Sequence, residues 1–261
     1  MMLFQFKMKD ALNCMFIPAE VGKRRPVWYF MTDSEYCLDL GKVKLFEHSD
    51  TYLQKNLQEY PNHPKYFDYY YVRFLEDLFY ELPKISCVMP DEIYAMHDEI
   101  KEWWFAGGEE EEWLTYELSD VIIQNLLWIG SIDTMTGGAL QFLHRNDDIF
   151  VRYDFSEIDE DGMKTWTANS GEYRLSYEDF VAEIEDLLER FFARMDKQVQ
   201  DVVANFTEKE VAEANIVAEH EERRTYFYGI LDDVKQGKYE NSVDWHQVRE
   251  DLAYVVERIR R

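Results

Sequence analysis

Short apolar runs in the first third of the chain predict β-strands. Each run is rich in aromatic and branched residues, which strands favour, and turn residues such as Gly41 separate them. A polar segment, residues 48–65, follows without such a pattern. The predicted strands are Leu3–Lys7, Val27–Met31, Glu35–Leu40 and Lys42–Glu47.

The periodicity then becomes helical. Between Tyr66 and Leu82 the apolar residues fall on one helix face, and Pro83 is expected to end this helix. Two more helices are expected from Pro90 to about Phe105 and from about Trp113 to Ile129. Together these segments predict a central helical block.

A second set of strands follows this block. Ala139–His144 and Asp148–Phe155 alternate with period two around a polar turn, which predicts a hairpin. Met163–Ala168 and Glu172–Leu175 are expected to extend it into a meander. The sequence leaves open whether both sets of strands share one sheet.

The last third is predicted to be helical. Ser176 with Asp179 resembles a capping box, and apolar residues from Phe180 to Phe206 recur at spacings of four and three, as in a packed helical hairpin. Two further helices are expected from Thr207 toward Lys235 and from about Val243 to Arg260. The predicted fold class is therefore α+β, with antiparallel strands, a central helical block and a long C-terminal helical bundle. Residues 1–175 would form the α+β part and residues 176–261 a helical part packed on it as one compact unit.

Composition adds a strongly negative charge to this picture. The 261 residues include 53 acidic and 28 basic side chains, a formal net charge of −25, yet 16% are aromatic and 46% hydrophobic. Disorder needs a shortage of apolar residues, so we expect a folded domain with an acidic surface. Phosphate binding needs clustered lysine and arginine, so the sequence argues against direct binding of nucleic acid.

The start of the chain, its apolar runs and its cysteines predict a cytoplasmic protein. No signal peptide is evident at the start, and the longest apolar run is far shorter than the roughly 20 residues that span a bilayer, so no membrane association is expected. Three cysteines without metal-ligand spacing suggest reduced thiols.

Motifs that carry chemistry are missing from the sequence. The six histidines are scattered, and no phosphate-binding glycine loop or nucleophile elbow occurs. Carboxylates spaced four apart, such as Asp77 and Glu81, are expected by chance in so acidic a chain. We therefore predict no catalytic residue, cofactor or metal ligand, and interpret Glu76 and Asp77 as ion-pair partners of Arg73.

The most unusual segment surrounds Gly107-Gly108. It combines tryptophans with four consecutive acids, as interfaces for basic proteins do. A plainer interpretation, which the sequence favours, is that the tryptophans end two helices and the acids form a solvated loop. The candidate partner-binding residues are Trp103, Trp104, Glu109, Glu110, Glu111, Glu112 and Trp113.

Two stretches carry a family resemblance. They are Trp28-Tyr29-Phe30-Met31-Thr32-Asp33-Ser34 with its continuation to Gly41, and Trp166-Thr167-Ala168-Asn169-Ser170-Gly171. With Asp68-Tyr69 to Pro83, Phe150–Asp154 and Arg194-Met195, they resemble an uncharacterised bacterial family of unknown function, over about residues 3–205. The resemblance implies no activity or cofactor. Its members are similar in style to cytoplasmic immunity proteins, which are acidic, aromatic-rich and α+β.

These observations favour a non-catalytic cytoplasmic protein that binds a basic protein partner, such as an immunity-type inhibitor of a nuclease toxin. Acidic residues would steer the association and aromatic residues would exclude water from its centre. Alternative hypotheses are an enzyme that uses a carboxylate-bound divalent metal, a DNA mimic that blocks a nucleic-acid-binding protein, and a homo-oligomer formed through the C-terminal helices.

Overall fold

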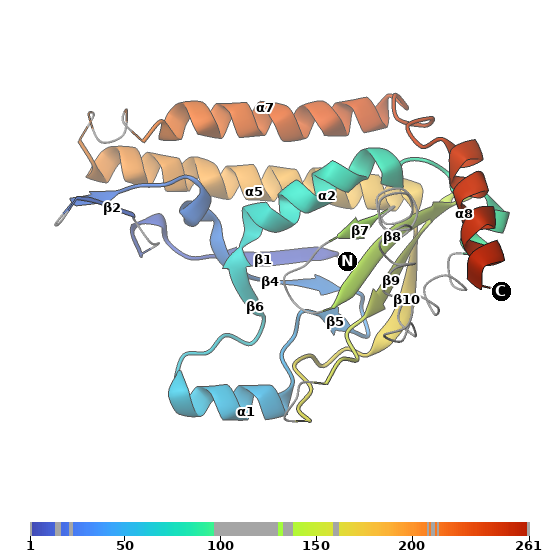
Figure 1. The fold of residues 1–261 in the computed structure, drawn as a ribbon. Coiled ribbons are helices and arrows are strands. Elements are labelled where there is room, and N and C mark those ends of the chain that lie inside the picture. Colours follow the sequence, from blue (N-terminus) through green and yellow to red (C-terminus); the bar gives the residue numbers. More distant parts are fainter. Residues whose placement is uncertain are drawn as a thin grey trace.

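The structure is a computed structural model that describes residues 2–13, 17–20, 23–96, 130–132, 138–158, 162–207, 209, 212 and 214–259. These residues form two four-stranded antiparallel sheets, a separate β-hairpin and a layer of long helices (Figure 1). The predicted α+β fold is confirmed, and the two sets of strands belong to separate sheets. Most of the predicted central helical block falls on residues 97–129, outside the described residues.

The first sheet is built around one central strand. Strand β4 pairs along one edge with β1, where Phe4 lies opposite Leu38, and its other edge pairs with β5 and β6. All of these pairings are antiparallel. The strands are β1 (Phe4–Met8), β4 (Asp33–Asp39), β5 (Lys44–Leu45) and β6 (Phe67–Tyr70).

The second sheet has the order β10-β9-β8-β7. Its central hairpin closes where Arg145 pairs with Asp148, and Asn146 in the turn has a positive φ of 54°. This confirms the predicted hairpin. The strands are β7 (Ser131–Ile132), β8 (Ala139–Arg145), β9 (Asp148–Asp154) and β10 (Ser170–Ser176).

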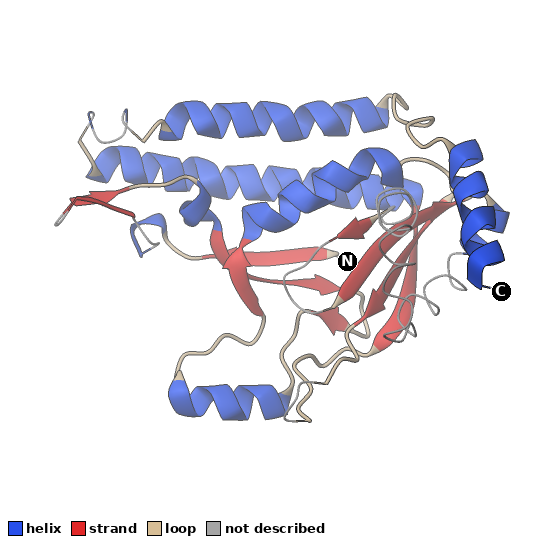
Figure 2. Ribbon diagram, viewed as in Figure 1, coloured by secondary structure: helices blue, strands red, loops and turns tan. Residues whose placement is uncertain are grey.

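Three long helices cover the sheets (Figure 2). α5 contacts β1 and β9, α2 contacts β4 and β8, and α7 packs on both helices. The helices are α2 (Tyr71–Ile85), α5 (Tyr177–Asn205) and α7 (Ile216–Lys235), with α1 (Asp50–Glu59) and α8 (Trp245–Ile259) at the periphery. Short elements complete the fold: the 3-10 helices η1 (Ala11–Asn13) and η2 (Tyr29–Thr32), and the hairpin of β2 (Ile17–Glu20) and β3 (Lys23–Arg25).

One continuous apolar core extends from Leu3 to Val234, and it includes both sheets and the helical layer. Aromatic rings dominate its centre, with Trp28 and Phe191 at 6.2 Å between ring centroids. The seam predicted from Phe180 onward faces this core, because Phe180, Phe191 and Val202 are fully buried within the chain. A second copy of the chain is therefore not needed to cover these residues.

Three local predictions are wrong, each because tertiary contacts override local preference. The predicted strand Val27–Met31 does not form: Trp28 precedes the 3-10 helix η2, and Trp28 and Met31 are both buried. Residues Phe67–Tyr70 form strand β6 on the free edge of β4, so the helix predicted from Tyr66 begins only at Tyr71. Of the predicted strand Met163–Ala168, the structure shows only isolated bridges.

Two helix boundaries also differ from prediction. Pro83 lies inside the last turn of α2, which ends at Ile85, and the Ser86 N–H still reaches the Leu82 carbonyl at 3.0 Å. Helix α1 lies within the polar segment 48–65, where the sequence pattern predicts no element. The side chain of Ser49 caps it by accepting from the Tyr52 N–H at 3.1 Å, and no residue of α1 is buried, so it leaves no apolar stripe in the sequence.

Candidate functional site

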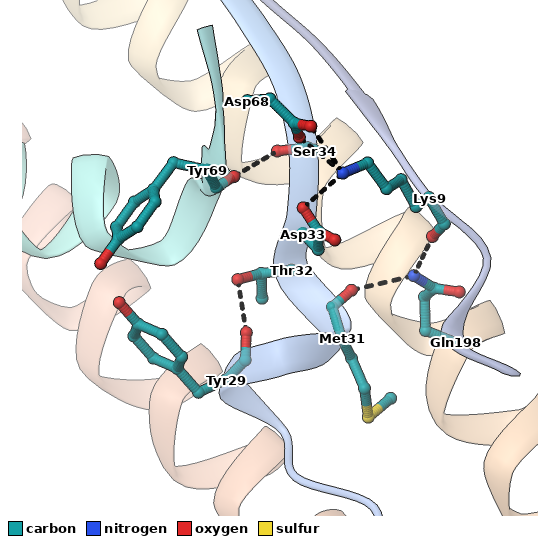
Figure 3. A network of polar contacts seen from close by, with 9 residues as sticks. All are labelled: Lys9, Tyr29, Met31, Thr32, Asp33, Ser34, Asp68, Tyr69 and Gln198. Carbon is teal, nitrogen blue, oxygen red and sulfur yellow. Dashed lines mark hydrogen bonds and ion pairs between the residues drawn. The ribbon is translucent and has the colours of Figure 1, made fainter. Parts of the chain in front are cut away.

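A lysine between two carboxylates joins three strands of the first sheet (Figure 3). Lys9 follows β1, and its Nζ lies 3.0 Å from Asp33 Oδ1 on β4 and 2.7 Å from Asp68 Oδ1 on β6. Burial by itself would lower the pKa of Lys9, but the two carboxylates outweigh it and raise the pKa. Burial raises the pKa of Asp33, an effect that Lys9 opposes and Asp68 reinforces.

A buried amide fixes the chain beside this lysine. The Gln198 side chain, on α5, donates to the carbonyls of Lys9 at 2.8 Å and Met31 at 2.9 Å, as Figure 3 shows. Its oxygen accepts from the Ala11 N–H at 2.7 Å. Because these groups satisfy one another, we interpret the cluster as a clamp between strands and α5 rather than as a ligand site.

The first turns of α5 form an acidic ridge that separates two hollows in the surface. We define this ridge by Glu178, Asp179, Glu183, Glu185, Asp186 and Glu189. Ser176 sets its start, because its side chain caps the helix by accepting from the Asp179 N–H at 3.0 Å. Acidic residues suit this position, where the positive end of the helix dipole lies.

The large hollow, of about 1120 Å³, opens where the β8–β9 turn, the start of α5 and the end of α7 meet. Its walls are partly apolar. In the described part of the chain four acids and one lysine line it, and this lysine, Lys235, pairs with Glu185 at 2.6 Å. The apolar lining includes Val88, Tyr177, Val181, Val234 and Trp245, and the acidic lining is Asp147, Glu178, Glu185 and Glu240.

A buried histidine forms part of the wall of the large hollow. The ring of His144 stacks on Tyr177 with 4.2 Å between centroids and 7° between planes, and its Nδ1 lies 3.2 Å from the Ser86 carbonyl oxygen. Burial lowers the pKa of His144, although the Ser86 and Asn146 carbonyls oppose this. The histidine is therefore neutral at pH 7 and adds no cation to the hollow.

The small hollow, of about 620 Å³, lies on the other side of the ridge. Among the described residues, no lysine or arginine lines it. Glu183 accepts from the Leu3 N–H at 2.7 Å and Asp186 from Arg190 at 2.7 Å, which orients both carboxylates. Its lining is Met2, Leu3, Tyr173, Leu175, Asp179, Ala182, Glu183 and Asp186.

Most cations along the described surface are taken up by carboxylates of the same chain. Lys44 pairs with Asp39 and Lys65 with Glu47, for example. The Arg73–Asp77 pair, at 3.0 Å, confirms one ion pair expected from sequence, whereas Glu76 pairs with Arg223 at 2.6 Å and not with Arg73. In contrast, three carboxylates at the large hollow, Asp147, Glu178 and Glu240, have no cationic partner among the described residues.

The comparisons with known proteins identify a family but not an activity. A family model described as a family of unknown function (DUF5984) matches residues 3–251. The chain belongs to this family. The match extends past residue 205, where the sequence resemblance was expected to end, and includes α7 and the first half of α8. No curated protein and no solved structure matches the chain.

The residues proposed from sequence as a partner site are not placed by the structure. Trp103, Trp104, Glu109, Glu110, Glu111, Glu112 and Trp113 all lie outside the described residues. In the part of the chain that is described, no helix is long and apolar enough to cross a bilayer, and no three histidine, cysteine or acidic side chains gather as metal ligands would.

The hollows could not be found from sequence. Their acids come from the β8–β9 turn, α5 and the loop after α7, and each of these acids resembles many others in a chain with 53. The one local signal is the pair Ser176 and Asp179, which predicts a capped helix start and not a hollow.

Proposed function

We propose that the protein is a non-catalytic binding protein that docks on a basic protein partner, in the manner of an immunity-type inhibitor of a nuclease toxin. The observation that carries the proposal is the set of unpaired carboxylates, Asp147, Glu178 and Glu240, around a partly apolar hollow. Exposed carboxylates without internal partners attract cations of a partner, and such attraction speeds association.

Inhibition would follow from occlusion. A partner that places a basic surface against the acidic ridge of α5 loses access to that surface for its own anionic substrate. The apolar side chains in both hollows, such as Trp245 and Leu175, would exclude water from the contact.

We propose the bacterial cytoplasm as the site of action. Cys37 and Cys87 are free and buried, and burial raises the pKa of the Cys37 thiol to about 11. Such thiols suit a reducing compartment, where an inhibitor would meet a toxin made in the same cell.

The test uses two sets of charge variants with equal charge change. The first combines Asp147→Asn, Glu178→Gln and Glu240→Gln. The control combines Glu59→Gln, Glu157→Gln and Glu221→Gln, which are exposed acids that line neither hollow. A partner is captured at low salt from the native lysate and purified, and its affinity for each protein is then measured at several salt concentrations.

We expect the first set to weaken binding at least tenfold, the control set to change it by less than about threefold, and added salt to weaken binding by the natural protein. An affinity that does not change with salt, or equal losses in both sets, would show that the proposal is wrong.

A further inference from the structure

The two hollows adjoin at a single small residue. Ala182 lines both the large and the small hollow, and it is exposed on the surface of α5. The acidic ridge therefore projects less at Ala182, because Ala182 has only a methyl group whereas the ridge residues one turn before and after it have longer, acidic side chains. A chain that crossed α5 here would have a hollow on each side.

Each hollow has the chemistry that suits a lysine or arginine side chain. These side chains have an apolar stem and a cationic head, and they are bound best where an apolar wall leads to carboxylates. The large hollow offers Val181 and Trp245 with Glu178, and the small hollow offers Leu175 and Tyr173 with Asp179. Charge complementarity therefore specifies the occupant of both.

We infer that an extended basic segment of the partner crosses α5 over Ala182 and places one lysine or arginine side chain in each hollow. This inference rests on the proposed function, because it takes the partner to be basic. It adds the place of contact, the conformation of the bound segment and the number of side chains that enter.

The dimensions of a helix set the spacing of the two basic residues. A helix with its side chains is about 10–12 Å across. In an extended chain, residues two apart point to the same face at about 6.6 Å, and residues four apart do so at about 13 Å. Basic residues four positions apart therefore fit the crossing, whereas adjacent ones point to opposite faces.

The first experiment blocks the crossing. Ala182→Trp places a large ring between the hollows without removing a carboxylate, and Ala193→Trp is its control, because Ala193 is an exposed alanine of α5 that lines neither hollow. Binding is measured at low salt by fluorescence anisotropy with a labelled peptide that carries two arginines four positions apart. A second peptide of the same composition has the arginines adjacent.

We expect Ala182→Trp to weaken binding of the first peptide at least tenfold and Ala193→Trp to change it by less than about twofold. The natural protein should bind the first peptide at least fivefold more tightly than the second. If Ala182→Trp folds poorly, judged by circular dichroism, Ala182→Lys replaces it with Ala193→Lys as control, since lysine is a good helix former.

The outcomes separate this inference from the proposed function. Suppose that Ala182→Trp binds the first peptide as tightly as the natural protein does, while the Asp147→Asn, Glu178→Gln, Glu240→Gln variant loses affinity. The inferred crossing over Ala182 is then wrong and the proposed function stands. If Ala182→Trp and Ala193→Trp weaken binding equally, the crossing is also wrong. If neither Ala182→Trp nor the carboxylate variant changes the affinity, both proposals fail.

Discussion

The indole N–H of Trp28 donates a hydrogen bond of 3.2 Å to Nδ1 of His220, which lies 192 positions later in the chain. Since Nδ1 accepts from the indole, the ring carries a proton on Nε2, which lies 2.9 Å from Asp196 Oδ1. Arg224 pairs with the same oxygen. Burial would raise the pKa of Asp196, but the hydrogen bond from His220 and the charge of Arg224 lower it. The network thus joins the segment before η2 to α5 and α7.

We predict that His220→Ala lowers the free energy of unfolding by about 2–4 kcal/mol, because it removes a buried ring and leaves the Trp28 N–H without an acceptor. Urea unfolding measures this change. His246→Ala is the control, since its side chain is 77% exposed, and we expect a change within about 0.5 kcal/mol. Equal effects of the two substitutions would contradict the role of the network.

Two glycines should respond to alanine with opposite signs. A Cβ at Gly130 would lie 2.0 Å from the Phe142 carbonyl oxygen, and the φ of Gly130 is +72°. Gly130→Ala should therefore destabilise the protein by more than about 2 kcal/mol. At Gly229, inside α7, a Cβ would meet nothing within 4 Å, so Gly229→Ala should stabilise by about 0.5–1 kcal/mol. Thermal and urea unfolding measure both changes. A Gly130→Ala variant as stable as the natural protein would contradict the close approach of Gly130 to the Phe142 carbonyl.

The stability of the protein should fall as the pH is lowered through about 6.5, the ordinary pKa of histidine. His48 lies between the rings of Trp166 and Tyr52, at 4.8 and 4.7 Å between centroids. Burial lowers the pKa of His48, an effect that the Pro64 carbonyl opposes and His63 reinforces. The unfolded chain then binds more protons than the folded protein, so stability is complete above about pH 6.5 and is lost as the pH falls toward the lowered pKa.

His48→Phe tests the origin of this pH dependence. It keeps a ring in the stack but removes the titrating group, so the free energy of unfolding should depend less steeply on pH between about 7.5 and 5.5. His144 also has a lowered pKa, because it is buried, and should supply part of the remaining slope. An unchanged slope in His48→Phe would contradict the assignment.

The ion pairs of Lys9 with Asp33 and Asp68 should contribute modestly to the stability of the protein, since the Lys9 side chain is 41% exposed and solvent screens its charge. We predict that Lys9→Met destabilises by about 1 kcal/mol, because Asp33 and Asp68 then face each other without a cation. Adding Asp68→Asn should recover part of this loss by removing the repulsion. The control is Lys42→Met, at an exposed lysine. If the double variant is less stable than Lys9→Met alone, repulsion between the carboxylates is not the cause.

Elements with a strong apolar period could be predicted from sequence. The hairpin of β8 and β9 and the seam of α5 both follow from regular spacing, and Ser176 marks the start of α5 as expected. The errors fall where pairing over long sequence distances decides the structure. Phe67–Tyr70 becomes a strand because β4 offers an edge to it, and neither segment carries that information alone.

The candidate site lay beyond sequence reasoning for a related reason. Asp147 and Glu240 lie 93 positions apart in the sequence, and only the folded chain brings both to the lining of the large hollow. The net charge favours a basic partner as a hypothesis, but it carries no information about where on the surface such a partner would bind.

The contacts between β1 and α5 have a consequence for synthesis of the protein. Arg190 donates to the Phe4 carbonyl at 2.9 Å, 186 positions away, and Gln198 accepts from Ala11. On the ribosome, the apolar side of the first sheet gains α2 early but lacks α5 until residues near 198 have been made. Until then the first sheet lacks the cover that α5 gives it, so we expect the nascent N-terminal part to be more prone to aggregation than the finished protein.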